Sequence, residues 1–386
     1  MKIAIIALPI SEEQAVTPPL LLGYVASLLE QQRHIVRIYD LAIYGQNALN
    51  KIAEQVQAFR PHCIVLSSEN SEQASLVQHA FSSFKGNWVL LHDSLRIPQL
   101  TQALDPARSL RDSTLINDDQ RVILHALESL YGDLDSLPFP ARHLMEIERY
   151  PLETKSGHFQ TNVLIGHQIR SDLFLRNPRL IVSELRSITH EYGVWHVRFD
   201  GLALTSNAVW LNDFLYDLAI ARLDMKWEGI AYYQSLTPEL INLMHRAGCE
   251  AITLEFDAMY VLDSYAERAK LLSIVSALHE HEIFVQGHIL LEPRYSSIPA
   301  VVDMSATFGL DNVTFSIQDT DEVSPQAESP SLAQIITMAQ AQYRSVRDRQ
   351  GYVERYGNIL GPLVWRIGRL DLRSRFWQSQ ATGHSQ

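Results

Sequence analysis

Short apolar runs alternate with amphipathic stretches along the first ~130 residues. The runs predict strands at Lys2–Leu8, Ile35–Tyr39, Cys63–Ser67 and Trp88–His92. Uninterrupted apolar runs are typical of strands buried on both faces. The stretches between them predict helices at Leu20–Gln31, Ala48–Phe59, Ser71–Phe84 and Asp119–Tyr131. This alternation predicts a doubly wound α/β domain, a parallel sheet with helices on both faces.

A second alternating series follows. Its predicted strands are Val163–Ile165, Val197–Asp200, Glu228–Tyr233, Ala251–Phe256, Ile283–Leu291 and Val313–Ile317. Its predicted helices are Pro178–Tyr192, Asn207–Ala221, Thr237–Ala247, Ser264–Glu280 and Ser297–Phe308. Six β/α units in succession indicate a partial (β/α)6 barrel of the TIM type, in which sites gather at the carboxyl ends of the strands.

Proline-containing segments suggest where the parts divide. Leu137–Pro140 reads Leu-Pro-Phe-Pro, and the polar residues after it are typical of a linker. We therefore expect a first domain over 1–135, a linker over 136–160 and the barrel over 161–320. Residues 321–386 then form an acidic turn region and a basic helical tail.

Composition limits the function classes. The chain has 386 residues, 46% hydrophobic and 20% charged, as in globular proteins. No apolar run approaches the ~18 residues of a membrane-spanning helix. Glu12 and Glu13 follow the first apolar run where a signal peptide would need small residues, so that run reads as a buried strand. Only two cysteines occur, which favours a reducing, cytoplasmic location over a disulfide framework.

Charge is distributed unevenly. The net charge is −12, but residues 331–386 carry eight arginines against three acidic residues, a surplus of +5 that leaves −17 for the rest. An acidic body is a poor surface for nucleic acid, which needs clustered cations. No phosphate-binding glycine loop of the P-loop or dinucleotide type occurs either.

Several segments, in this order, resemble the cobalamin (B12)-binding-domain radical S-adenosylmethionine family. They are Pro-Pro-Leu-Leu-Leu-Gly-Tyr-Val-Ala-Ser-Leu-Leu-Glu (18–30), His-Ile-Val-Arg-Ile-Tyr-Asp-Leu (34–41), Leu-Pro-Phe-Pro (137–140), Asn-Pro-Arg-Leu-Ile-Val-Ser-Glu-Leu (177–185), Tyr-Gly-Val (192–194), Phe-Asp (199–200) and a Leu-Met-His-Arg-Ala-Gly-Cys ending (243–249). The resemblance covers roughly residues 1–320. It implies a cobalamin-binding domain followed by a radical S-adenosylmethionine barrel.

The chemistry of that family depends on a CxxxCxxC loop that holds a [4Fe–4S] cluster. The family places this loop between Val163 and Asn177, where this chain has no cysteine. Cys63 and Cys249 are distant in sequence and read as small buried apolar residues. His167 is the one potential iron ligand in the segment, and one imidazole does not replace three thiolates. A [4Fe–4S] cluster is therefore not expected.

Other family positions have changed too. The fourth barrel strand of the family ends Gly-x-Glu-Ser, of which Glu255 alone is kept, and the fifth keeps only Pro293. In the first domain, His92 stands where the family has Gly-Gly-x-His, and no D-x-H-x-x-G motif supplies a cobalt ligand. Cobalamin and S-adenosylmethionine stay possible ligands by resemblance.

Asp200, Glu255 and His288 are the candidate binding residues of the barrel, with His92 in the first domain. The first three stand near the carboxyl ends of three predicted strands. They are suited to acid–base chemistry or to a divalent metal. The alternative, which we favour, is that they are ancestral residues that are now hydrogen-bonded across a filled barrel mouth.

The tail mixes arginine with aromatic residues. Its candidate contacts to a partner or a membrane are Trp365, Arg366, Arg369, Arg373, Arg375 and Trp377. Such a segment suits an anionic membrane surface or an acidic partner. It equally suits docking on the chain's own acidic body.

The sequence thus favours a cluster-free binding, scaffold or regulatory protein. The partner would be a protein such as an active relative, or a tetrapyrrole or other small molecule, since some family members modify tetrapyrroles. The alternative is a non-radical enzyme, for example a methyl transferase, that uses a residual S-adenosylmethionine or cobalamin site. A third hypothesis is a peripheral membrane protein held by its tail.

Overall fold

The computed structural model describes residues 1–8, 17–44, 49–67, 71–91, 118–130, 132–150, 160–169, 172–291, 298–317, 336–344, 355–357, 360 and 364. These residues divide into two compact units. The first contains Met1–Ala231 and Glu239–Ala251, and the second contains Tyr232–Pro238 and residues from Ile252 onward.

The amino-terminal sheet has four parallel strands in the order β2-β1-β3-β4. The strands are β1 (Lys2–Ala7), β2 (Ile35–Asp40), β3 (Cys63–Ser67) and β4 (Asn87–Leu91). The helices are α1 (Leu20–Gln31), α2 (Leu41–Tyr44), α3 (Leu49–Phe59), α4 (Ser71–Ala80) and α6 (Asp118–Ser129). This order, with strand 1 inside, is that of a doubly wound fold.

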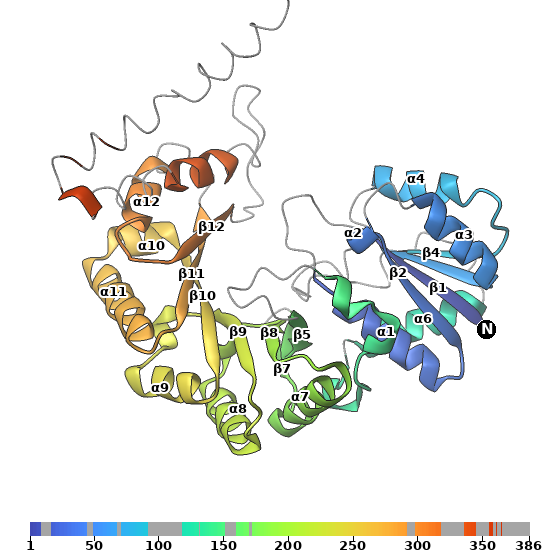
Figure 1. Ribbon diagram of the computed structural model, residues 1–386, viewed down its shortest axis with the longest axis horizontal. Helices are drawn as coiled ribbons and strands as arrows, with labels where there is room; N and C mark the ends of the chain where they lie inside the picture. The colour runs from blue at the N-terminus through green and yellow to red at the C-terminus, as the bar shows by residue number, and fades with distance from the viewer. Residues whose placement is uncertain are drawn as a thin grey trace, which may run out of the picture. The chain divides into compact units, whose positions relative to one another are not determined.

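Alternation along β1 explains why helices cover both faces of this sheet. Ile3 and Ile5 join a core with α1 and α6, whereas Ala4 and Ile6 join a second core with α3 and α4. Figure 1 shows these two pairs of helices on opposite sides of the blue strands. Because both sets are apolar, the strand is buried throughout, as its uninterrupted hydrophobic run predicts.

The second sheet has six strands in the order β12-β11-β10-β9-β8-β5. They are β5 (Gln160–Leu164), β8 (His196–Asp200), β9 (Lys226–Ala231), β10 (Cys249–Asp257), β11 (Phe284–Leu291) and β12 (Asn312–Ile317). The helices are α7 (Pro178–Tyr192), α8 (Ala208–Ala221), α9 (Pro238–Arg246), α10 (Ala258–Asp263), α11 (Tyr265–Glu280) and α12 (Ile298–Ser305). All six predicted strands are present. β5 pairs in parallel with β8, β8 with β9, and β11 with β12. The predicted α/β class is therefore confirmed.

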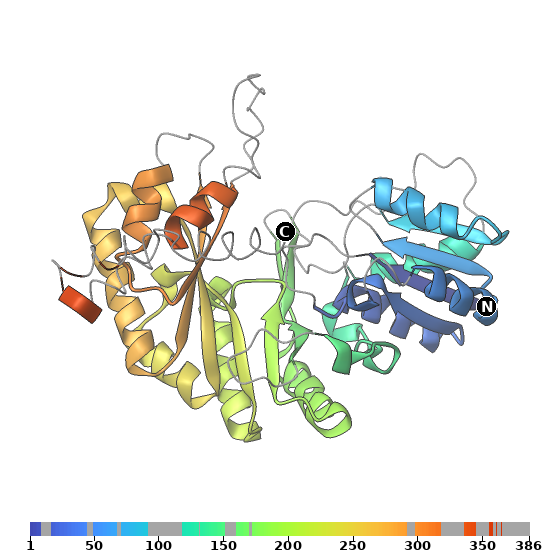
Figure 2. The ribbon, with the colours of Figure 1, turned by 45° about the horizontal axis from the view of Figure 1, so that its top comes forward.

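The strands of the second unit have one apolar and one polar face. Leu254 and Phe256 of β10 and Ile289 of β11 are buried, and their neighbours along each strand are partly exposed. Figure 2 shows α11 and α12 on one side of these yellow and orange strands. The buried side chains therefore pack beneath the helices, and the opposite face keeps access to water.

A short hairpin was not predicted. β6 (Gly166–Ile169) and β7 (Asp172–Leu175) form a two-stranded antiparallel sheet between β5 and α7. Within its described residues, the predicted linker contains two short 3₁₀ turns, η3 (Arg142–Leu144) and η4 (Ile147–Arg149), and a third turn, η2 (Leu134–Ser136), ends at its first residue. Among the described residues no helix is long and apolar enough to cross a membrane.

Candidate functional site

The polar face of the second unit brings together two of the predicted residues. Glu255 lies near the end of β10, and its Oε2 is 3.1 Å from Nδ1 of His288 on β11. Nε2 of the same ring is 2.9 Å from Oγ of Ser316 on the next strand, β12. Three adjacent strands thus present one hydrogen-bonded row, which we call the Glu–His–Ser row.

The row is partly exposed to solvent. The side chains of His288 and Glu255 are 25% and 23% exposed. Burial, with a contribution from Glu255, raises the pKa of Tyr232, which follows β9 in sequence and is 39% exposed. Carboxylate, imidazole and hydroxyl groups together suit a polar ligand.

Asp200, the third predicted residue, belongs to the other unit and is already engaged. Arg198 donates from Nε to Asp200 Oδ1 at 2.8 Å, and Asn162 donates from Nδ2 to Oδ2 at 3.1 Å. The Asp200 carboxylate, more than burial, determines the pKa of Arg198, which is raised. Asp200 therefore acts as the counter-ion of a neighbouring arginine.

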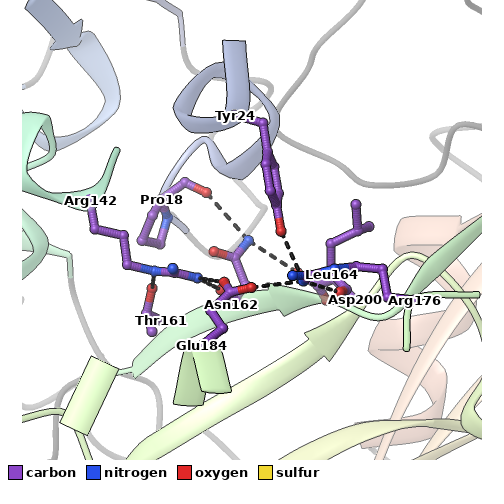
Figure 3. Close-up of polar contacts among 9 residues, drawn as sticks. All are labelled: Pro18, Tyr24, Arg142, Thr161, Asn162, Leu164, Arg176, Glu184 and Asp200. Carbon is purple, nitrogen blue, oxygen red and sulfur yellow. Dashed lines mark hydrogen bonds and ion pairs between the residues drawn. The ribbon is translucent and has the colours of Figure 1, made fainter. Parts of the chain in front are cut away.

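A buried ionic cluster lies beside Asp200, and no motif in the sequence indicates it (Figure 3). Arg142 of η3 and Arg176, just before α7, each donate to the Glu184 carboxylate on α7 at 2.7 Å. All three side chains are at most 3% exposed. We call these residues, with Tyr24 of α1, the Arg–Glu–Arg cluster.

Each charge in the cluster has further partners. Arg142 also donates to the Asn162 carbonyl at 2.7 Å, and Arg176 donates to Tyr24 Oη at 2.9 Å and to the Leu164 carbonyl at 2.8 Å. Burial alone would raise the pKa of Glu184, but the two guanidinium groups lower it below its usual range. Burial, with Glu184, raises the pKa of Tyr24, so this phenol stays neutral.

The cluster connects elements that are far apart in sequence. α1, η3, β5 and α7 each contribute to it, and Asn162 on β5 also donates to the Pro18 carbonyl at 3.4 Å. Such a network fixes the amino-terminal domain to the first strands of the second sheet. Its role is structural, because both carboxylate oxygens of Glu184 accept hydrogen bonds from buried arginines.

The β6–β7 hairpin occupies the segment where the family resemblance expects the cluster loop. His167 of β6 is fully buried and stacks on Phe174 of β7, with 5.1 Å between the ring centroids. Burial lowers the pKa of His167. A neutral imidazole packed inside a hairpin is a structural residue.

The chain's thiols do not fit a [4Fe–4S] cluster. Cys63 is fully buried in β3 of the amino-terminal sheet, and Cys249 begins β10 at the end of the strand opposite to Glu255. The Cys249 thiol donates to the Ala251 carbonyl at 3.7 Å, and burial raises its pKa well above the ordinary value. A cluster needs several thiolates converging on one point, and these two thiols are buried in separate strands.

Other predicted contacts lie outside the described residues. These are His92 in the first domain and, in the tail, Trp365, Arg366, Arg369, Arg373, Arg375 and Trp377. Within the described ranges, no group of three or more histidine, cysteine or acidic residues is placed to hold a metal ion.

At the carboxyl end of β2, Asp40 accepts from the Ala42 amide at 2.9 Å and from the Tyr150 hydroxyl at 2.7 Å.

Comparison with known proteins gives the fold. No protein-family model and no curated protein matches the sequence. The radical S-adenosylmethionine methyltransferase TsrM from Kitasatospora setae, solved with cobalamin and a [4Fe–4S] cluster bound, superposes with a TM-score of 0.57 at 10% identity over 82% of this chain and 74% of that one. A structure of TsrM with tryptophan substrate and aza-SAM bound gives 0.57 at 11% identity, over 81% and 72%.

OxsB, a cobalamin-dependent S-adenosylmethionine radical enzyme solved in its apo form, superposes with a TM-score of 0.55 at 10% identity. The match covers 92% of this chain and 56% of OxsB. The chain therefore has the fold of cobalamin-dependent radical S-adenosylmethionine enzymes, and the resemblance seen in the sequence is confirmed at the level of the fold.

Proposed function

We propose that this chain is a cluster-free relative of the cobalamin-dependent radical S-adenosylmethionine enzymes and acts by binding. The carrying observation is the β6–β7 hairpin, a cysteine-free element with a buried His167 where the cluster loop would stand. The buried positions of both thiols support it. In this role the protein recruits or regulates a partner, an active relative or a protein that handles a tetrapyrrole.

Iron analysis tests this proposal. After anaerobic reconstitution with iron and sulfide, we expect no stoichiometric iron and no thiolate-to-iron absorption, because no described site gathers thiolates. The matched control is the C63A/C249A double variant, whose spectrum should equal that of the wild type. Stoichiometric iron in the wild type that disappears from the double variant would overturn the proposal.

The candidate ligand surface is the polar face that carries the Glu–His–Ser row. A carboxylate and an imidazole that are about three-quarters buried can still accept from or donate to hydroxyl and amino groups of a small molecule. By resemblance, Glu255 stands on a strand that binds cofactor in the family. This favours S-adenosylmethionine as the first ligand to test and supports the second candidate function, polar methyl transfer.

Calorimetric titration separates the two candidates. If the row holds S-adenosylmethionine, E255Q should weaken its binding about 10-fold or more, since a charged hydrogen bond contributes about 1.5–3 kcal/mol. E250Q, which changes an acidic residue on the same strand, is the control and should leave the affinity unchanged. No heat for the folded wild type with S-adenosylmethionine or cobalamin would leave the partner-binding role and remove the methyl-transfer role.

A further inference from the structure

The Glu–His–Ser row has the order of groups found in hydroxyl-nucleophile enzymes. Glu255 Oε2, the two ring nitrogens of His288 and Ser316 Oγ form one chain with links of 3.1 and 2.9 Å. The same carboxylate–imidazole–hydroxyl order occurs on several unrelated folds and is recognised by geometry, not by sequence position. Here the arrangement arises from the alternation of side chains along each strand, because Glu255, His288 and Ser316 each point to the polar face of their own strand.

The hydrogen-bond partners determine which ring nitrogen carries the proton. An ionised carboxylate only accepts, so Nδ1 of His288 donates to Glu255. In the neutral ring this leaves Nε2 as an acceptor, and the Ser316 hydroxyl donates to it. Glu255 thus holds the imidazole in the tautomer that can receive the serine proton.

Two further features favour reactivity over a purely structural role. The imidazole and carboxylate retain about a quarter of their exposure, whereas the ions of the Arg–Glu–Arg cluster are at most 3% exposed. Among the described residues, β12 is also the edge strand of its sheet, so one side of its backbone lies outside the ladder. N–H groups on such an edge can donate to a substrate carbonyl oxygen.

We propose that Ser316 is a nucleophile toward carboxylic esters, with His288 as its general base and Glu255 as a positioning residue. Ser316 Oγ bonds to the carbonyl carbon while its proton passes to His288 Nε2. The bond from that carbon to the leaving oxygen then breaks, and His288 returns the proton to the departing alcohol. Water, deprotonated by the same imidazole, hydrolyses the acyl-serine and restores the hydroxyl.

This activity goes beyond the binding role and does not depend on it. The cluster-free role is argued from the β6–β7 hairpin and the buried thiols, whereas the ester chemistry is argued from the Glu–His–Ser row, which is also the candidate ligand surface proposed above. Failure of one leaves the other standing.

A fluorophosphonate probe tests the proposal on the full-length protein. Attack by Ser316 Oγ forms an O–P bond and expels fluoride, with the proton taken by His288. We expect one label per chain, mapped to Ser316 by mass spectrometry and absent from S316A. H288Q should slow labelling about 10²–10⁴-fold. E255Q should slow it about tenfold or more and shift its pH profile.

The control is S187A. Ser187 is partly exposed on α7 and donates to Glu191 at 2.6 Å, and the change should leave labelling unaltered. Labelling of Ser316 that persists in H288Q, or a folded wild type that stays unlabelled, would reduce the row to hydrogen bonds that stabilise the sheet.

A second variant keeps the test informative if H288Q fails to fold. In S316C, the thiol beside His288 should react with iodoacetamide faster at pH 6–7 than the thiol of S187C, because an adjacent imidazole favours the thiolate. Equal rates for the two thiols would overturn the proposed pairing.

Discussion

E184Q should lower the free energy of unfolding by about 3–5 kcal/mol, the usual cost of breaking a buried ion pair from one side. Glu184 is the one carboxylate bonded to both Arg142 and Arg176, at 2.7 Å each. Glutamine keeps the shape of the side chain but leaves two buried guanidinium groups without their counter-charge. Urea denaturation followed by tryptophan fluorescence measures the change.

The control for this prediction lies two turns further along α7. E191Q alters an exposed residue and should change the free energy of unfolding by less than about 0.5 kcal/mol. A loss below about 1 kcal/mol for E184Q would mean that the arginines find other partners or water when the carboxylate is removed.

The pH dependence of the free energy of unfolding, measured for the wild type and for E184Q, distinguishes the loss of charge from a loss of packing. Because the folded state lowers the pKa of Glu184, its ionisation stabilises the fold fully above the unfolded value near 4.5. That contribution is lost as pH falls through the lower folded pKa. The stability difference between wild type and E184Q should therefore shrink below about pH 4.5. A constant difference from pH 7 to pH 3 would assign the loss to packing.

Much of the fold could be predicted because local pattern determines it. The runs at Lys2–Leu8 and Cys63–Ser67 are apolar on both faces, and this requires helices above and below. The six strands of the second sheet alternate with helices, of which α7 and α9 have a clear 3.6-residue periodicity. Their pairing in sequence order follows from the preference of consecutive β/α units to lie side by side.

The hairpin was missed for a physical reason. Gly166–Leu175 is short, and its alternation is interrupted by apolar residues on both faces, so periodicity does not separate it from a loop. Family resemblance also directed attention to the missing cysteines, not to the residues that took their place. The stacking of His167 on Phe174 is a signal only once the two strands are known to pair.

The candidate site was predicted in part. Glu255 and His288 stand near the ends of predicted strands, and in the structure His288 Nδ1 lies 3.1 Å from Glu255 Oε2. Ser316 was not selected, since a lone serine in a strand has no distinguishing pattern, and its register relative to His288 comes only from the pairing of β11 with β12. The Arg–Glu–Arg cluster joins residues 42 and 8 positions apart, without a motif, so sequence spacing could not reveal it.

G201A should destabilise the protein by about 3–5 kcal/mol, more than any exposed glycine substitution in the chain. Gly201 follows β8 with a φ of +105°, and a Cβ there would lie 2.0 Å from the Gly166 carbonyl oxygen at the start of the hairpin. The neighbour is backbone, so it cannot rotate away. Denaturation measures the loss, and hydrogen exchange should show faster exchange across β6 and β7.

G193A is the matched control, because Gly193 also has a positive φ, +64°, but meets nothing within 4 Å. It should cost only the conformational strain of about 1–2 kcal/mol. If G201A costs no more than G193A, the hairpin moves away easily from β8. A loosely held hairpin would weaken the proposed cluster-free role, since that segment could then reorganise around a cofactor. A large, local loss would instead mean that close backbone contact fixes the hairpin, which leaves no room there for a cluster loop.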